Sequence, residues 1–190
     1  MKVLKFGGTS VGSAKSILQV IDIIQNTSGK KVVVFSAFSG VTNLLVAIGE
    51  NSPHASSKLN DLKSSCAVII DNLFETNSYK QVAHNFLALT LEKITDVLSN
   101  GINEETQRFL VAQGELISSH VIQFYMQEQG INSRLIPALD FMRTNENNEP
   151  NIELIRSLIH PILEEKPSNL YITQGFICRD IHNKINNLQR

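Results

Sequence analysis

The sequence has few cysteines, little excess charge and no long apolar run, and each absence excludes a class of protein. Its two cysteines, Cys66 and Cys178, lie far apart and lack metal-ligand spacing, which favours free thiols in a reducing compartment over a disulfide scaffold. The 17 Lys and Arg residues nearly balance the 18 Asp and Glu residues, so the formal net charge is −1. The chain therefore lacks the basic surface that is typical of proteins that bind nucleic acid or acidic membranes.

No apolar stretch approaches the ~18 residues that a membrane-spanning helix needs, and the N-terminus lacks the pattern of a signal peptide. We therefore expect a cytoplasmic protein that has no membrane partner. The chain has 190 residues, of which 42% are hydrophobic. This is enough for a buried core and fits one domain or part of a larger one.

Short apolar runs alternate with longer amphipathic segments. Four runs, two of them β-branched and suited to burial on both faces, predict strands at 3–6, 32–35, 134–138 and 170–173. Helical spacing predicts a helix between an N-cap at Ser13 and a stop at Gly29, and further helices over 41–49, 59–73, 82–98, 104–129 and 152–163. The alternation predicts an α/β fold, a three-layer αβα sandwich around a mostly parallel sheet, with the helices between 59 and 129 as an insertion.

A lysine followed by two glycines ends the first predicted strand. Lys5 interrupts an apolar run, and a buried or half-buried ammonium is costly unless a negative group meets it, so its partner could be a ligand. The segment that follows is Gly7, Gly8, Thr9 and Ser10. Paired glycines let backbone N–H groups converge on an anion, and Lys5 would add a point charge for a phosphate. The order is the reverse of a P-loop. Alternatively, the lysine simply extends into water.

Polar residues also follow the other predicted strands. Ser36, Gly40 and Thr42 follow the second strand, Thr144 follows the third, and a Thr-Gln-Gly segment at 173–175 follows the fourth. Because the carboxyl ends of parallel strands meet at one edge of a sheet, we expect these loops to form one site. Ser36 and Thr42 could instead cap the helix that begins near residue 41.

Five segments in this order closely resemble aspartokinases, which are members of the amino-acid kinase superfamily. They are KFGGTSVG, SAFSGVTNLL, QGE, FMRTN and TQGFI, and the resemblance extends from residue 2 to about residue 177. The TQGFI and MRTN forms look most like the lysine-branch, single-function aspartokinases. The resemblance implies an ATP- and Mg²⁺-dependent enzyme that phosphorylates the side-chain carboxylate of L-aspartate. Its product would be 4-phospho-L-aspartate, at the start of lysine, threonine and methionine biosynthesis.

The resemblance also implies roles for individual residues. Lys5 would neutralise the transferring phosphoryl group, and Glu115 would bind the α-ammonium of aspartate. The path of the phosphoryl group would be lined by Gly7, Gly8, Thr9 and Ser10. Aspartate would be contacted by Ser36, Gly40, Thr42 and Arg190. Glu115 could instead be an ordinary solvated glutamate, and Arg143 a structural loop residue. The scattered histidines and Cys178 suggest no metal ligand or nucleophile.

Residues 178–190 depart from the family pattern. By spacing from Gly175, Leu188 and Arg190 fall on the family's leucine and substrate-binding arginine, whereas Cys178 and Gln189 replace glycines. The serine-aspartate pair that follows the arginine in the family, the later segments that would hold ATP, and the regulatory ACT domains do not occur in these residues. We therefore expect residues 1–190 to be the N-terminal portion of an aspartokinase catalytic domain.

Two expectations follow from that departure. The 190-residue chain alone should be inactive as a kinase. It should self-associate into a homo-oligomer, because a parallel sheet that lacks outer strands leaves unpaired edges. Two alternatives stay open, namely a non-catalytic remnant that binds aspartate or a partner, and another enzyme of the same superfamily.

Overall fold

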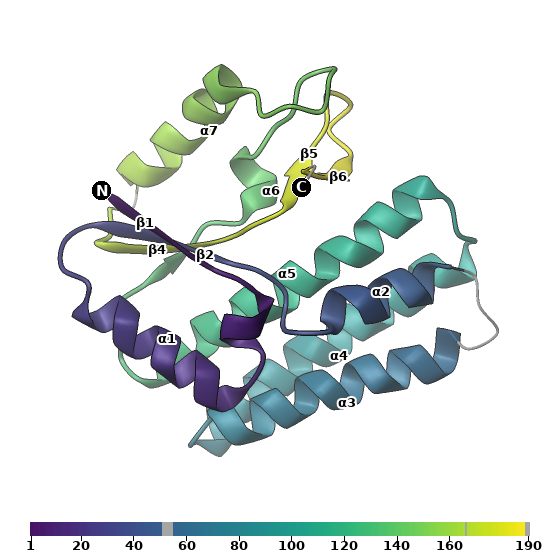
Figure 1. Cartoon of the computed structure of the whole chain (residues 1–190), viewed down its shortest axis with the longest axis horizontal. Coiled ribbons are helices and arrows are strands. Elements are labelled where there is room, and N and C mark those ends of the chain that lie inside the picture. Colours follow the sequence, from purple (N-terminus) through teal and green to yellow (C-terminus); the bar gives the residue numbers. More distant parts are fainter. Residues whose placement is uncertain (51–54, 166, 189–190) are drawn as a thin grey trace.

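A parallel four-stranded sheet forms the centre of the computed structural model, which describes residues 1–50, 55–165 and 167–188. The strands lie in the order β1-β2-β4-β3, and all three neighbouring pairs are parallel. Helices cover both faces of this sheet (Figure 1). The predicted three-layer α/β architecture is thereby confirmed.

The element bounds are as follows. The strands are β1 (Lys2–Phe6), β2 (Lys31–Phe35), β3 (Arg134–Leu135), β4 (Leu170–Gln174), β5 (Ile177–Arg179) and β6 (Ile185–Asn187). The helices are the 3₁₀ turn η1 (Gly8–Val11), α1 (Ala14–Asn26), α2 (Val41–Gly49), α3 (Ala55–Leu73), α4 (Asn77–Ser99), α5 (Glu104–Glu128), α6 (Ala138–Phe141) and α7 (Ile152–Glu165).

Helix α1 forms where the sequence predicts it. The side chain of Ser13 accepts a hydrogen bond from the Ser16 backbone in a capping box, which satisfies N–H groups that the first turn leaves free. At the other end, the buried Lys31 ammonium at the start of β2 donates to the Ile24 carbonyl, 2.9 Å away, and to the Thr27 carbonyl. A cation suits the negative end of a helix. The helix ends at Asn26, and Gly29 (φ +84°) lies in the turn to β2.

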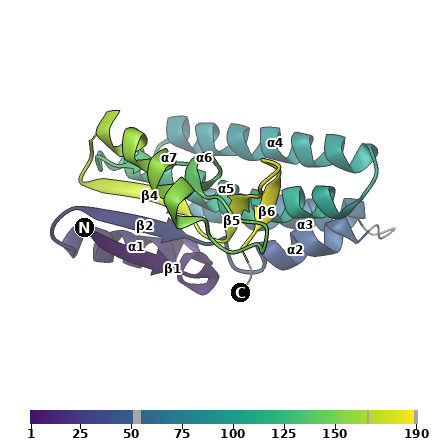
Figure 2. The same cartoon turned by 90° about the horizontal axis from the view of Figure 1, so that it is seen from above.

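Side chains on the two faces of the sheet belong to two separate apolar clusters. Val33, Phe35 and Ile172 pack with α1, α2, α3 and α5 on one face. Tyr171 packs with Ile136 and with apolar side chains of α7 on the other face. Figure 1 shows this separation, with α6 and α7 on one side of the strands and α1 with α5 on the other. Turning the molecule shows the helices α3, α4 and α5 extending beyond the sheet (Figure 2).

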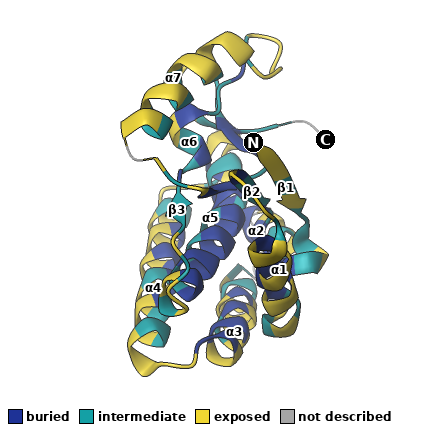
Figure 3. Ribbon diagram, turned by 90° about the vertical axis from the view of Figure 1, so that its left-hand side faces the viewer, coloured by how far each residue is buried: buried dark blue, intermediate teal, exposed yellow. Residues whose placement is uncertain are grey.

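Helix α5 differs from the other helices of the predicted insertion. Helices α3 and α4 pack on other helices, whereas α5 contacts β2, β3 and β4 directly. Its surface is largely buried along its length, while α7 has no fully buried residue (Figure 3). Helix α5 is therefore part of the sandwich, and only α3 and α4 form an outer layer.

The structure corrects several expectations about the elements. Strand β1 is not buried on both faces but is an edge strand, with Val3 68% exposed. Strand β3 has two residues instead of five, because its pairing with β4 ends near Pro137, which has no N–H to donate. Helix α4 begins at Asn77, five residues before the predicted start. The sequence also predicts a loop over 49–57 that contains Pro53. Pro53 lies outside the described residues, and α3 already begins at Ala55.

An antiparallel hairpin that the sequence did not predict follows β4. Strands β5 and β6 pair with Cys178 opposite Asn186. The Asp180 carboxylate organises the turn, accepting hydrogen bonds from the backbone N–H groups of His182 and Lys184 at 2.9 Å each.

Among the described residues, no helix is both long enough and apolar enough to cross a bilayer.

Candidate active site

The three long parallel strands end at the same level. Phe6 of β1 pairs with Phe35 of β2, which pairs with Gln174 of β4. The loops after these strands therefore begin side by side, as predicted for the carboxyl edge of a parallel sheet. Two backbone hydrogen bonds continue the pairing past the strands, from Ser36 N–H to the Phe6 carbonyl (3.1 Å) and from Gly175 N–H to the Phe35 carbonyl (2.9 Å).

The loop after β1 brings Lys5 to this edge. Lys5 is exposed, so the expectation of a buried or half-buried ammonium is wrong. Its Nζ makes no hydrogen bond or ion pair with any residue in the described ranges. Gly8 packs so closely on the second loop that a Cβ there would lie 3.0 Å from the Ala37 carbonyl oxygen. A glycine at this position therefore lets the two loops touch.

The loop after β2 turns sharply into α2. Gly40 is the N-cap residue of α2 and has φ +81°, a left-handed conformation that favours glycine. No side chain caps this helix among the described residues, so the alternative that Ser36 and Thr42 serve as its caps is wrong. Both side chains are instead partly exposed beside the neighbouring loops.

Helix α5 supplies the acidic side of the site. Glu115 is only 4% exposed, so the solvated-glutamate alternative is wrong. The residue before it, Gly114, lies against the second loop and α2, where an added Cβ would be 2.9 Å from the Ala37 Cβ. This close approach brings the Glu115 side chain to the ends of the strands.

These segments together line a pocket of about 610 Å³. Its lining residues are Lys5, Gly7, Gly8, Thr9, Ser36, Ala37, Phe38, Ser39, Gly40, Thr42, Asn43, Glu115, Phe176 and Leu188. Lys5 and Glu115 are the ionisable side chains of this set, one of each sign. The pocket therefore offers an exposed ammonium and a buried carboxylate, with hydroxyl, amide and backbone groups between them.

Eight of the ten site residues predicted from the sequence line this pocket. Ser10 lies in the 3₁₀ turn of the first loop, where its N–H donates to the Gly7 carbonyl at 2.9 Å, and does not line the pocket. Arg190 lies outside the described residues. Thr144 follows β3 by nine residues and is buried away from the pocket lining, in a bridge to Pro150.

Arg143 is a structural loop residue, which was one of the alternatives drawn from the sequence. Within the described residues, its hydrogen bonds go to backbone carbonyl groups and not to an acidic side chain. Its guanidinium donates to the backbone carbonyls of Leu139 and Met142 at 3.0 Å each. Burial, together with the nearby Arg179, lowers the pKa of Arg143.

Phe176 and Leu188 line the pocket without having been predicted. Phe176 has φ +63°, which is unusual for a bulky residue. Its carbonyl accepts a hydrogen bond from the Leu188 N–H at 2.7 Å, which holds the end of the β5–β6 hairpin at the pocket. The TQGFI segment was noted in the sequence, but nothing in it indicates that the phenylalanine adopts this conformation.

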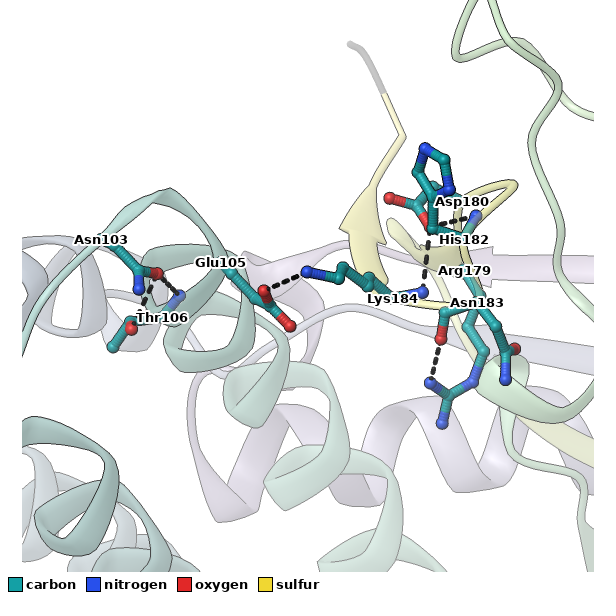
Figure 4. A network of polar contacts seen from close by, with 8 residues as sticks. All are labelled: Asn103, Glu105, Thr106, Arg179, Asp180, His182, Asn183 and Lys184. Atoms are coloured by element: carbon teal, nitrogen blue, oxygen red, sulfur yellow. Dashed lines mark hydrogen bonds and ion pairs between the residues drawn. The ribbon is translucent and has the colours of Figure 1, made fainter. Parts of the chain in front are cut away.

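Polar contacts anchor the hairpin to the beginning of α5. Lys184 points toward Glu105, and its Nζ lies 2.6 Å from Oε2 (Figure 4). The Arg179 guanidinium donates to the Asn183 carbonyl at 2.8 Å, across the turn. Asn103 caps α5 by accepting from the Thr106 N–H at 2.9 Å. One wall of the pocket is thus tied to the helix that carries Glu115.

The cysteines and histidines within the described ranges do not form a second reactive centre. Burial raises the pKa of Cys178 to about 11 and that of Cys66 to about 12, which disfavours the nucleophilic thiolate. His84 faces one acid, with Nε2 2.8 Å from Asp71 Oδ1. Within the described ranges, no group of three or more His, Cys, Asp or Glu side chains could hold a metal ion.

Comparison with known proteins gives one consistent result. The model of the amino acid kinase family matches residues 1–189. Lysine-sensitive aspartokinase 3 of Escherichia coli K12 is 31% identical over 185 residues, covering 92% of this chain and 40% of that protein. An aspartokinase of Chlamydia pneumoniae is 28% identical, with 92% and 38% covered.

Solved structures agree with the sequence comparison. E. coli aspartokinase III in complex with lysine and aspartate superposes on the whole chain with a TM-score of 0.88 and 30% identity, covering 44% of that chain. The same enzyme with aspartate and ADP gives a TM-score of 0.87 and 29% identity. The chain spans about two fifths of the length of these relatives. The family model, the sequence relatives and the fold together establish that this chain belongs to the amino acid kinase family.

Proposed function

We propose that the chain is the N-terminal portion of the catalytic domain of an aspartate kinase. The complete enzyme would transfer the γ-phosphate of ATP to the side-chain carboxylate of L-aspartate and form 4-phospho-L-aspartate. The observation that carries this proposal is the pocket with one ammonium, Lys5, and one buried carboxylate, Glu115, on separate elements. The likeness to aspartokinases in sequence and fold supports the choice of substrate.

Lys5 would act on the transferring phosphoryl group. Phosphoryl transfer needs little covalent help from the protein, and depends mainly on positioning and on stabilising the charge of the phosphoryl oxygens. The exposed ammonium of Lys5 can approach those oxygens without first breaking an ion pair to a described residue. Gly7, Gly8 and Thr9 line the same pocket and would leave room for the phosphoryl group beside their backbone.

Glu115 would bind the α-ammonium of L-aspartate. A positioned carboxylate is a strong partner for an ammonium group, and burial strengthens the attraction. Ser36 and Thr42 would contact the carboxylates of the substrate through their hydroxyl groups, and Gly40 would allow the backbone to approach closely. Arg190 is assigned to the substrate through the family resemblance alone.

The family implies both ATP and Mg²⁺, and the described side chains include no cluster that could hold the metal ion by themselves. The kinase family implies ATP, and one of the similar structures is a complex with ADP. The pocket's acidic lining is a single carboxylate, and no metal-binding cluster occurs within the described ranges. We therefore derive no step through Mg²⁺, which would enter as the MgATP complex implied by the family.

A second candidate is a non-catalytic remnant that binds aspartate or a partner. It is favoured by the departure of residues 178–190 from the family pattern, where Cys178 and Gln189 replace glycines. A cytoplasmic location and homo-oligomeric assembly stay predictions in both cases.

Two assays on the 190-residue chain test the proposal. Calorimetric titration should detect binding of L-aspartate, and a coupled assay should detect no aspartate-dependent consumption of ATP by this chain alone. Failure to bind L-aspartate would contradict the substrate assignment. Aspartate-dependent ATP consumption would instead contradict the expectation that the chain is inactive alone.

The role of Lys5 is tested by a matched pair of variants. Lys5→Met should lower the affinity for tripolyphosphate about tenfold or more, as expected for the loss of one charge-assisted contact. Lys2→Met removes an exposed lysine of the same strand that does not line the pocket. It should leave the affinity unchanged, and equal losses in the two variants would argue against the assigned role of Lys5.

A further inference from the structure

Two neighbouring serines of α5 are hydrogen-bonded to the ends of two different strands. Ser118 and Ser119 are both 0% exposed. The Ser118 hydroxyl lies 2.8 Å from the carbonyl oxygen of Ser36, the first residue after β2. The Ser119 hydroxyl accepts a hydrogen bond of 2.7 Å from the side chain of Gln174, the last residue of β4. Helix α5 is thereby joined to both strand ends at the pocket.

The Gln174 side chain extends this connection to a third element. Its Oε1 accepts a hydrogen bond of 2.7 Å from the Ala138 N–H at the beginning of α6. Gln174 is only 3% exposed, so both ends of its amide are satisfied within the protein. This buried link holds β4 and α5 together independently of the Ser118 contact.

Ser118 lies one turn after Glu115 on the same face of α5. Residues three apart are neighbours on a helix surface. The Ser118 hydroxyl is also 3.2 Å from the Glu115 carbonyl. A hydroxyl donates only one proton, and the shorter distance favours the Ser36 carbonyl as its acceptor. The turn that carries the buried carboxylate is therefore fastened to a pocket-lining residue of the second loop.

We propose that Ser118 is a positioning residue. It would hold the Glu115 side chain and the loop that begins at Ser36 in the relative position that binds an α-ammonium group. This proposal rests on the proposed function, because it takes the ligand of Glu115 to be the ammonium of an amino acid. Ser118 itself does not line the pocket, so it acts through its hydrogen bond. Removing its hydroxyl would leave the partly buried carbonyl of Ser36 without that donor and would let the loop move away from α5.

A ligand comparison separates this role from general stabilisation. Ser118→Ala should weaken binding of L-aspartate about fivefold to tenfold, the effect of losing one partly buried hydrogen bond. Succinate keeps both carboxylates but lacks the α-ammonium, so its affinity should change much less, and the preference for aspartate should fall. The control is Ser157→Ala, which removes an exposed serine hydroxyl that bonds within α7, 2.8 Å from the Leu154 carbonyl.

Amide hydrogen exchange tests the geometry without any ligand. In Ser118→Ala the peptides that cover residues 36–43 should exchange faster than in the unchanged chain and in Ser157→Ala, while α1 peptides should not change. Faster exchange of this loop would support the positioning role even if the unchanged chain bound no aspartate, a result that would overturn only the proposed function. Unchanged exchange, or an equal loss of affinity for aspartate and succinate, would overturn the inference.

Discussion

The glycines around the pocket differ in what they contribute, and the difference lies in their backbone angles. Gly40 adopts φ +81°, where an L side chain is strained, whereas Gly7 has φ −78° and ψ 172°, which any residue adopts. A Cβ on either residue would meet no atom within 4 Å. Replacing each of these two glycines with alanine therefore tests the effect of backbone conformation without that of steric contact.

Gly40→Ala should lower the free energy of unfolding by about 1–2 kcal/mol, the cost of a left-handed conformation for an L residue. Gly7→Ala should leave it unchanged or raise it by about 0.4–1 kcal/mol, because it removes conformational freedom only from the unfolded chain. Urea denaturation of both variants measures these changes. Equal effects in the two variants would contradict the assignment of strain to Gly40.

At the scale of the helices and strands, the sequence predicted the starts of helices well where a single capping residue sets the start. Helix α2 has the predicted bounds because a positive-φ glycine starts it, and α1 begins at its serine cap. Strand β1 has three apolar residues of five and β2 has four of five, yet β1 lies at the edge. So small a difference in composition does not distinguish an edge strand from a central one.

The hairpin and the buried polar links could not be predicted in the same way. Strand β6 reads Ile-Asn-Asn and pairs through its backbone, with its middle residue, Asn186, buried. Gln174 and Ser118 are single polar residues whose partners lie 55 and 82 positions away in sequence. Only the folded chain brings such partners together. The loops of the site were predictable because strand direction alone places them at one edge.

Helices α4 and α5 share an aromatic contact that should make stability depend on pH. His120 of α5 stacks on Phe86 of α4 with ring centroids 4.4 Å apart, and burial lowers the pKa of His120 from 6.5. Below that value the unfolded chain binds a proton more readily than the folded chain does. The contribution of His120 to stability is therefore complete above about pH 6.5 and is lost as the pH falls toward the folded-state pKa.

His120→Gln should flatten this dependence. The free energy of unfolding of the unchanged chain should fall between pH 7.5 and pH 5.5, and that of the variant should fall less, as measured by urea denaturation at several pH values. His160→Gln, which removes an exposed histidine of α7, should retain the full slope. The same slope in all three proteins would show that His120 does not cause it.

At the scale of the whole molecule, the outer side of β1 has no strand partner among the described residues. Val3 is 68% exposed on this edge, and an open apolar edge is a surface for pairing with another chain. We therefore expect the 190-residue chain to self-associate, in line with the homo-oligomer predicted from the sequence.

Val3→Lys should weaken that association, because charged side chains on an edge strand disfavour pairing. Sedimentation velocity over a range of concentrations would show a lower average mass for this variant than for the unchanged chain. Leu89→Lys, at a 57%-exposed position on α4, should behave as the unchanged chain does. An equal reduction by both variants would place the contact elsewhere.

Strands β1, β2 and β4 end at the same level, with Phe6, Phe35 and Gln174 paired side by side. This alignment limits the insertions and deletions that the strands can accept during evolution. Inserting or deleting one residue in any of these strands would shift its loop by about 3.3 Å and turn every later side chain of the strand to the opposite face. Point substitutions in the strands should therefore be common among descendants of this sequence. Changes of strand length should be rare, and diversity of length should collect in the outer helices α3 and α4.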